Sequence, residues 1–490
     1  MDRVIWLIIL PLLTAFSLGL LKLYFKRYFN YIIIISSTVH IILAFVVANQ
    51  AIKEPIVYNL GNWSPLLGIT LVIDSFSALF LLAIVTLAYL VTIYAIKFIK
   101  RDKLKYHTLS LLLLTGAIGI VITGDLFNLY VFFEIVSISS YALAAINKDK
   151  ESFEGAFKYL ILGSISGILI LLAIILIYQS TGTLNLAQAA VKFKEVPRNL
   201  KVTILTFYLI GFASKFALVP LHSYLADVYS KASVTFTALS SGIVLKTSLY
   251  ALIRIVYILF GVEFIIDSGL QDILIYWGTL TFIAAHLLAY QQNSLRRLLG
   301  YSSIAHMGYI IMAFALANKG GIIAGSYHLT NHIVMKGALF LATGIFIYNL
   351  KDDQISKLKG IGKTLPYSSL IFTIAALAII GLPPFNGFVS KWLIIKQVLE
   401  ANYSIPAFLI LIGSLLSLIY YLRVIKELYS KANDDKSLVK EPLILKLPAL
   451  TLGLFCLLLS LLPSFAPKLL ETLPEFLIKQ NNYINLLLRR

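Results

Sequence analysis

The chain has 490 residues, of which 59% are hydrophobic and only 13% are charged, and its mean hydropathy is +0.88. Soluble proteins carry about 25% charged residues, so this composition excludes a soluble globular protein and predicts a protein of the lipid bilayer. Much of the net charge of +18 lies in short segments between apolar runs, such as residues 97–105 and 351–363, as in cytoplasmic loops. No nucleic-acid-binding motif accompanies this charge, so nucleic acid is not an expected partner.

Apolar runs of about 20 residues, the length that crosses a hydrocarbon core, recur along the whole chain. They predict an all-α polytopic membrane protein with about fourteen transmembrane helices. The first run lacks the leader and cleavage site of a secretory signal peptide and is therefore predicted to be a membrane helix. In chain order the predicted spans are 4–24, 29–49, 71–97, 107–124, 126–147, 156–178, 202–223, 233–260, 273–290, 299–317, 322–348, 367–397, 402–425 and 447–467.

The segments between these spans alternate in charge, which predicts the orientation of the chain in the membrane. Basic segments such as 97–105, 148–158 and 351–363 fall on one side, whereas the other side has only one basic cluster, at 192–201. Because positive loops stay in the cytoplasm, both termini are expected outside the cytoplasm, in a cell (inner) membrane. The tail, residues 471–490, is expected to form only a short surface helix.

Two of the predicted spans are interrupted by proline next to a lysine. Gly-Phe-Ala-Ser-Lys-Phe at 211–216 precedes Pro220, and Gly-Phe-Val-Ser-Lys-Trp at 387–392 follows Pro383 and Pro384. Proline removes a backbone donor and clashes with the preceding turn, so both helices should break in mid-membrane. Paired broken helices are typical of transport sites near the bilayer midplane. The matching motifs predict two homologous five-helix units, flanked by helices on either side. The four regions are 1–106 (helices 1–3), 107–260 (helices 4–8), 273–425 (helices 9–13) and 426–490 (helix 14 and the tail).

Ionised side chains inside the membrane are the candidate functional groups, because each costs about 2.5–3.5 kcal/mol to insert. Glu134 and Lys215 are expected to pair, so that the carboxylate controls how firmly the lysine holds its proton. The alternative is a static ion pair that only fixes helix packing. Lys246 is centred in its span among small and hydroxylated residues that admit water. Lys391 lies in the second motif.

Histidines extend this set. His328, His332 and Lys336 recur at i, i+4 and i+8 and therefore share one helix face, which predicts a proton relay because histidine titrates near neutral pH. No Glu or Cys stands nearby to complete a metal site, so no metal is expected, and structural hydrogen bonding is the remaining alternative. His306 is a predicted bridge between the halves, and His222 is predicted to lead from Lys215 to the cytoplasmic surface.

No cofactor is expected in this chain. The one cysteine, Cys456, cannot hold an iron–sulfur cluster, and no Gly-rich nucleotide-binding loop occurs. If electrons drive this protein, another subunit handles them.

Several segments together resemble the antiporter-like subunits shared by Mrp-type cation/proton antiporters, respiratory complex I and membrane-bound hydrogenases. They are residues 124–134, 220–229, 241–254, 298–308 and 381–392. The resemblance implies a fourteen-helix fold with two inverted five-helix repeats, each with a broken helix. It also implies a Glu134–Lys215 pair, a central Lys246, a terminal Lys391, and other membrane subunits as partners. Because position 391 is a lysine and not a glutamate, the chain resembles the D-type subunit of Mrp antiporters, or its counterparts in hydrogenases, more than the complex I subunit that has glutamate there.

The predicted function is therefore translocation of protons, with sodium as a further candidate ion, by one subunit of a larger complex. The alternatives are a stand-alone transporter of an organic solute, a membrane enzyme and a scaffold that has lost transport. The interior offers mainly lysines and histidines, without obvious solute-binding groups or a nucleophile–base pair, so these alternatives are less favoured.

Overall fold

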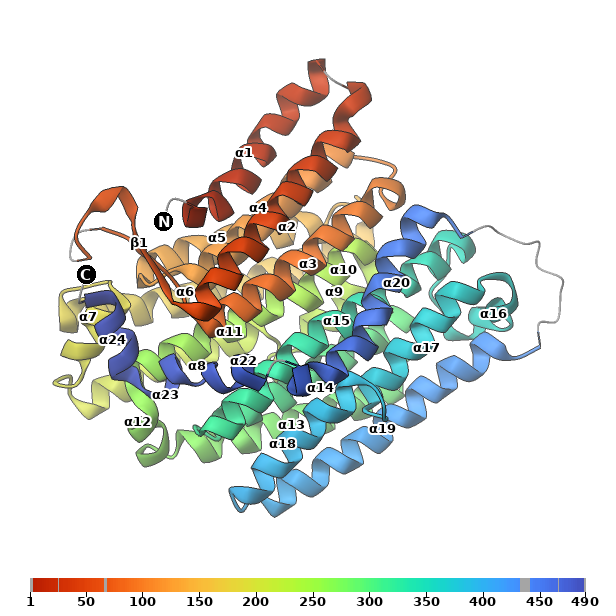
Figure 1. The fold of residues 1–490 in the computed structure, drawn as a ribbon. Helices are drawn as coiled ribbons and strands as arrows, with labels where there is room; N and C mark the ends of the chain where they lie inside the picture. The colour runs from red at the N-terminus through yellow and green to blue at the C-terminus, as the bar shows by residue number, and fades with distance from the viewer. Residues whose placement is uncertain (1–2, 25, 66–67, 432–440, 466, 489–490) are drawn as a thin grey trace.

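The computed structural model describes residues 3–24, 26–65, 68–431, 441–465 and 467–488, and helices dominate it (Figure 1). The long helices and the halves of interrupted ones are α1 (Arg3–Tyr24), α2 (Phe29–Lys53), α3 (Ser75–Phe98), α4 (Lys103–Ile122), α5 (Leu126–Ala144), α6 (Lys150–Thr181), α8 (Arg198–Lys215), α9 (Ser223–Lys231), α10 (Val234–Leu239), α11 (Leu245–Ile255), α12 (Gly261–Asp267), α13 (Leu270–Tyr290), α14 (Leu295–Ala315), α15 (Lys319–Leu350), α17 (Pro366–Ile380), α18 (Asn386–Glu400), α19 (Ser404–Tyr429) and α20 (Leu443–Leu458).

Shorter elements connect them. These are the antiparallel strands β1 (Ile56–Asn59) and β2 (Thr70–Ile73), the π-helical turns Ser240–Val244 and Val256–Phe260, the 3-10 turns Lys26–Tyr28, Leu60–Asn62, Ile355–Leu358 and Leu459–Leu461, and the helices α7 (Leu186–Phe193), α16 (Ile361–Thr364), α21 (Leu462–Phe465), α22 (Pro467–Thr472), α23 (Glu475–Ile478) and α24 (Gln480–Leu488).

The all-α polytopic architecture predicted from the sequence is confirmed. Within the described residues, twelve helices are long and apolar enough to cross a membrane. The other two predicted spans, 202–223 and 367–397, are the interrupted ones: α8 and α9 are separated at 216–222, and α17 and α18 at 381–385. Fourteen crossings in total stay a prediction.

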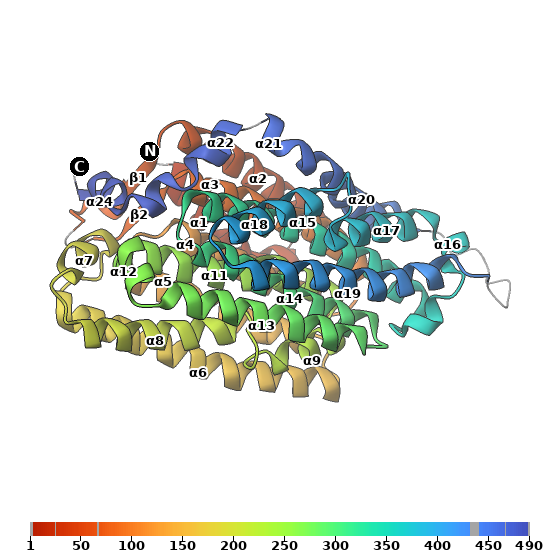
Figure 2. The same ribbon diagram turned by 90° about the horizontal axis from the view of Figure 1, so that it is seen from below.

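Some predicted boundaries were wrong. Residues 71–73 were assigned to the third span but belong to β2, and α3 begins only at Ser75, where the Asp74 carboxylate accepts a hydrogen bond from the Ser77 backbone N–H at 2.8 Å. The tail is more than a surface helix. Its short helices cross from α20 to α7 (Figures 1 and 2), and Tyr483 and Leu487 are buried.

The centre of the bundle is formed by α14 and α15, which other helices surround (Figure 2). An apolar stretch of 18 residues within α14 is wholly buried. Small residues permit this packing: a Cβ at Gly308 would come within 2.5 Å of the Gly278 carbonyl oxygen on α13. Polar groups on α14 and α15 are therefore shielded from lipid.

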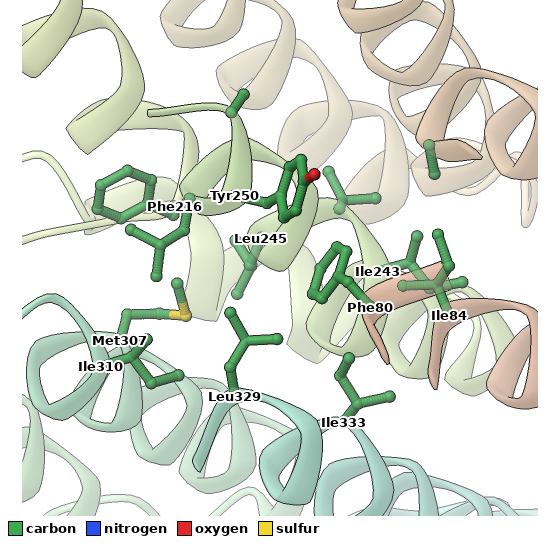
Figure 3. Close-up of a cluster of buried hydrophobic side chains, with 14 of the residues drawn as sticks. Phe80, Ile84, Phe216, Ile243, Leu245, Tyr250, Met307, Ile310, Leu329 and Ile333 are labelled. Atoms are coloured by element: carbon green, nitrogen blue, oxygen red, sulfur yellow. The ribbon is translucent and has the colours of Figure 1, made fainter. Parts of the chain in front are cut away.

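An apolar cluster joins the centre to the neighbouring elements (Figure 3). Phe80 and Ile84 of α3 and Ile243 of the first π turn pack near Leu329 and Ile333 of α15. All five side chains are buried, so α3 and the π turn pack closely against α15.

A buried ion pair ties α3 to α11. The two terminal nitrogens of Arg254 donate to the two Asp74 carboxylate oxygens at 2.6 and 2.9 Å, and one of them also donates to Ser77 Oγ and Tyr250 OH. The Tyr483 ring of α24 lies 5.3 Å from the guanidinium carbon. No local sequence pattern predicts this pair.

We expect Arg254→Met to lower the stability of the protein by about 3–5 kcal/mol, because it leaves the Asp74 carboxylate buried and uncompensated. Thermal denaturation of the purified protein in detergent measures the effect. The double variant Asp74→Ala/Arg254→Met removes both charges and should recover much of the loss. Equal destabilisation by the single and double variants would contradict the argument.

Candidate functional site

Four lysines lie inside the bundle: Lys215, Lys246, Lys336 and Lys391 are each at most 4% exposed. None of them belongs to any ion pair found among the described residues. Every one of the four ammonium groups instead donates hydrogen bonds to neutral oxygens. This arrangement is unusual, because a buried charge normally has a charged partner.

Lys215 is the last residue of α8, directly before the first break. Its Nζ donates to Ser137 Oγ at 2.7 Å and to Tyr141 OH at 2.9 Å, and it lies 4.6 Å from the centre of the Phe133 ring. Glu134 is on the same helix as these partners, α5, but the ion pairs of the described residues do not include one between Glu134 and Lys215. The predicted direct pair is therefore absent from this structure, because the two hydroxyls bind the ammonium group instead.

Lys246 lies just after the first π turn. Its Nζ donates to the Ser241 carbonyl oxygen at 2.5 Å, inside that turn. The Ser241 hydroxyl shares a hydrogen bond of 3.0 Å with Ser303 Oγ of α14. π turns inside α-helices occur frequently at functional sites, and this one links Lys246 to the central helix.

The central histidines meet between α14, α15 and α18. His306 Nδ1 shares a 2.9 Å hydrogen bond with His328 Nε2, and His328 Nδ1 shares another of 2.9 Å with Ser390 Oγ. The His332 ring centre is 4.7 Å from that of His306, and neither His332 ring nitrogen has a hydrogen-bond partner in the described part of the chain. Lys336 Nζ donates to the Leu299 carbonyl oxygen at 2.9 Å.

Lys391 lies just after the second break. Its Nζ donates to the carbonyl oxygen of Ile380, the last residue of α17, at 2.9 Å, and to Ser414 Oγ at 3.3 Å. Gly381, with φ of +92°, allows the chain to turn here, and a Cβ at this position would come within 2.9 Å of Lys391 Cδ. The turn conformation therefore favours glycine.

The two motif copies lie on opposite sides of their breaks. Lys215 ends the helix before the first break, whereas Lys391 belongs to the helix after the second. The prolines indicate this difference, because they follow the lysine in the first copy and precede it in the second. The breaks themselves agree with the sequence prediction.

Tyrosine hydroxyls are hydrogen-bond partners of the buried lysines and histidines that the sequence did not predict. His286 of α13, which is fully buried, shares hydrogen bonds with Tyr309 OH at 2.8 Å and with Tyr420 OH at 3.1 Å. The Tyr309 ring lies 5.3 Å from Lys391 Nζ. A tyrosine in an apolar run carries no sequence signal that separates such a partner from a packing residue.

His222 stands apart from the central groups. It precedes α9, is half-buried, and its Nδ1 has no hydrogen-bond partner among the described residues. Nearby, Asp227 pairs with Lys158 and Arg297 at the surface. The predicted path from Lys215 through His222 has no continuous hydrogen-bonded connection in the part of the chain that the structure describes.

No group of three or more His, Cys, Asp or Glu side chains placed to hold a metal ion occurs in the ranges that the structure describes. The buried polar side chains near the two breaks are mainly lysines, hydroxyls and imidazoles, and such groups accept and release protons.

Paired broken helices in a polytopic bundle, with buried ionisable groups at each break, define a membrane protein of the ion-transporting class. Residues 123–419, which include both breaks, match the model of the NADH:quinone oxidoreductase/Mrp antiporter transmembrane family. The chain belongs to this family. The membership favours an antiporter-like ion-translocating subunit over a stand-alone solute transporter.

Individual relatives support this family membership. The chain is 34% identical to the N-type subunit of NADH-quinone oxidoreductase from Desulforudis audaxviator over 77% of this chain and 76% of that protein. It is 32% identical to the D-type subunit of the Na(+)/H(+) antiporter from Alkalihalophilus pseudofirmus over 84% of both. A chain of the membrane-bound sulfane sulfur reductase, an archaeal respiratory membrane complex, superimposes with a TM-score of 0.94 at 33% identity, covering 99% of each chain.

The burial of the central lysines can be tested by chemical labelling. In a Cys456→Ser background, which removes the one native thiol, we expect Lys246→Cys and Lys336→Cys to resist a maleimide in native membranes. Lys148→Cys should react readily, because this side chain is 50% exposed. All three should react after denaturation, and rapid labelling of Lys246→Cys in the folded protein would contradict the structure.

Proposed function

We propose that this chain translocates protons as one membrane subunit of a multisubunit complex, either an Mrp-type antiporter or a redox-driven pump related to complex I and hydrogenases. The observation that carries the proposal is the set of buried lysines held only by neutral oxygens. The relatives are named as subunits of assemblies of these kinds, which supports other membrane subunits as partners. In this proposal the chain has no cofactor of its own and lies in the cell membrane with both termini outside the cytoplasm.

The chemistry follows from what surrounds each amine. Neutral oxygens accept hydrogen bonds from an ammonium group but do not fix its charge as a carboxylate does. Lys215, Lys246 and Lys391 therefore hold and pass protons. Glu134, one turn before Ser137 on α5, modulates Lys215 through its negative charge while the hydroxyls hold the ammonium group.

The central groups connect the two halves, which we assign to residues 107–260 and 273–425. On one side, Ser241 and Ser303 link the Lys246 turn to α14. On the other, His306, His328 and Ser390 form a hydrogen-bonded row that ends beside Lys391, with His332 and Lys336 alongside. His222 is assigned to proton access at the first break.

Glu134→Ala and Lys215→Ala should each abolish proton translocation while the complex still assembles. Lys215→Ala removes the proton carrier, and Glu134→Ala removes the charge that modulates it. The assay is the decay of a pH gradient across vesicles that contain the purified complex, with and without a sodium gradient to identify the exchanged ion. Lys148→Ala, at an exposed lysine paired with Asp102, is the control. Wild-type transport by either variant would refute the mechanism.

His328→Leu should slow proton translocation by about a hundredfold, the range in which positioned proton-transfer groups contribute. Leucine keeps much of the volume but removes both nitrogens that join His306 to Ser390. His40→Leu is the matched control, because His40 is also buried but bonds to the Leu7 carbonyl oxygen, outside the central groups. Equal effects of the two variants would show that the histidine row is structural.

A further inference from the structure

We infer that Ser137 and Tyr141 are positioning residues for Lys215: their hydroxyls form a cradle that holds the ammonium group away from Glu134 until the proton moves. The inference rests on the proposed function of Lys215 and adds a second holding position beside the carboxylate. The cradle is defined here as Ser137 Oγ and Tyr141 OH.

The cradle and the carboxylate share one helix face. Glu134, Ser137 and Tyr141 occur at i, i+3 and i+7 on α5, and this spacing places them on the same side. Lys215 Nζ occupies the cradle at 2.7 and 2.9 Å, while Glu134 lies one turn away. Because a lysine side chain has a flexible four-carbon stem, it can exchange between the two positions without movement of α8.

A stack of tyrosines fixes the cradle to the same residue that it holds. The Tyr141 ring meets Tyr159 of α6 edge-on at 4.8 Å, and Tyr159 stacks on Tyr224 of α9 at 5.0 Å. The Tyr224 hydroxyl then donates to the Lys215 and Ser214 carbonyl oxygens, each at 3.0 Å. The ammonium group of Lys215 is thus bound to Tyr141 at one end of this row of rings, and its backbone carbonyl is bound to Tyr224 at the other end. The row therefore fixes the position of the cradle relative to the first break.

Two glycines of α6 make room for the two holding positions separately. A Cβ at Gly163 would lie 1.9 Å from Tyr141 OH, and a Cβ at Gly167 would lie 2.5 Å from Glu134 Oε1. Neither glycine has a positive φ, so the space, and not the backbone conformation, requires glycine here. One methyl group at either site displaces one partner of Lys215 and leaves the other in place.

The test compares hydroxyl-containing and hydroxyl-free variants of nearly equal shape in the assembled complex. Ser137→Val/Tyr141→Phe should slow proton translocation by about tenfold or more, because each hydrogen bond to a charged group is substantial. Ser137→Thr has the shape of the valine variant but keeps the hydroxyl, and it should stay within about twofold of wild type by the same argument. Wild-type rates for the hydroxyl-free variant would overturn the inference, as would equal loss in the threonine and valine variants.

A second comparison separates displacement of the Tyr141 hydroxyl from a general packing defect in α6. Gly163→Ala should slow the wild-type protein strongly and have a clearly smaller effect in a Tyr141→Phe background, where the 1.9 Å approach to the hydroxyl is gone and only the ring-carbon contacts at 2.7 and 2.9 Å remain. Additive effects would overturn the inference. Lys215→Ala separates failure of the proposed function from failure of the cradle. Normal transport by Lys215→Ala would reject the proposed function. Loss of transport in Lys215→Ala, together with wild-type transport by the cradle variants, would reject the cradle alone.

Discussion

Four ammonium groups inside a membrane protein need oxygen atoms around them, and irregular backbone supplies those atoms to two of the four, Lys246 and Lys391. A regular helix uses its carbonyl groups internally and leaves only its last turn free. Lys391 binds the last carbonyl of α17, which the second break exposes, and Lys246 binds a carbonyl inside a π turn. Lys215 binds two hydroxyls of α5. The breaks, the π turn and the hydroxyls are therefore different solutions to one problem of solvation.

The same protein also contains a buried cation that is solvated in the opposite way. Arg254 has a complete bidentate carboxylate partner in Asp74, two further hydroxyl partners and a tyrosine ring beside it. Breaking such a pair is strongly destabilising, so the pair fixes α3 against α11. The lysines have no such partner among the described residues, so less energy opposes a change in their protonation or position. The difference between the two environments separates structural charge from mobile charge.

The central position of α14 and α15 explains why the histidines are placed there. Helices surrounded by other helices can carry polar side chains without exposing them to lipid. His306, His328 and His332 contact one another across these helices, and Ser390 connects them to the second break. The apolar cluster of Figure 3 includes Met307, Leu329 and Ile333, which are next to these three histidines in the sequence. The histidine row is thereby enclosed in a buried centre that also contains many apolar side chains.

The sequence alone determined the properties that depend on local pattern. Apolar run lengths predicted the membrane helices, prolines predicted both breaks, and the cost of membrane charge identified the four lysines and their histidines. Their partners were decided only by tertiary packing. Glu134 was the expected partner of Lys215, but Tyr141 and Ser137 bind it. Asp74 and Arg254 are 180 residues apart, and neither has a local signal that names the other. Hydropathy and helical period describe which residues face inward, whereas hydrogen-bond partners depend on the rotation and depth of helices from distant parts of the chain.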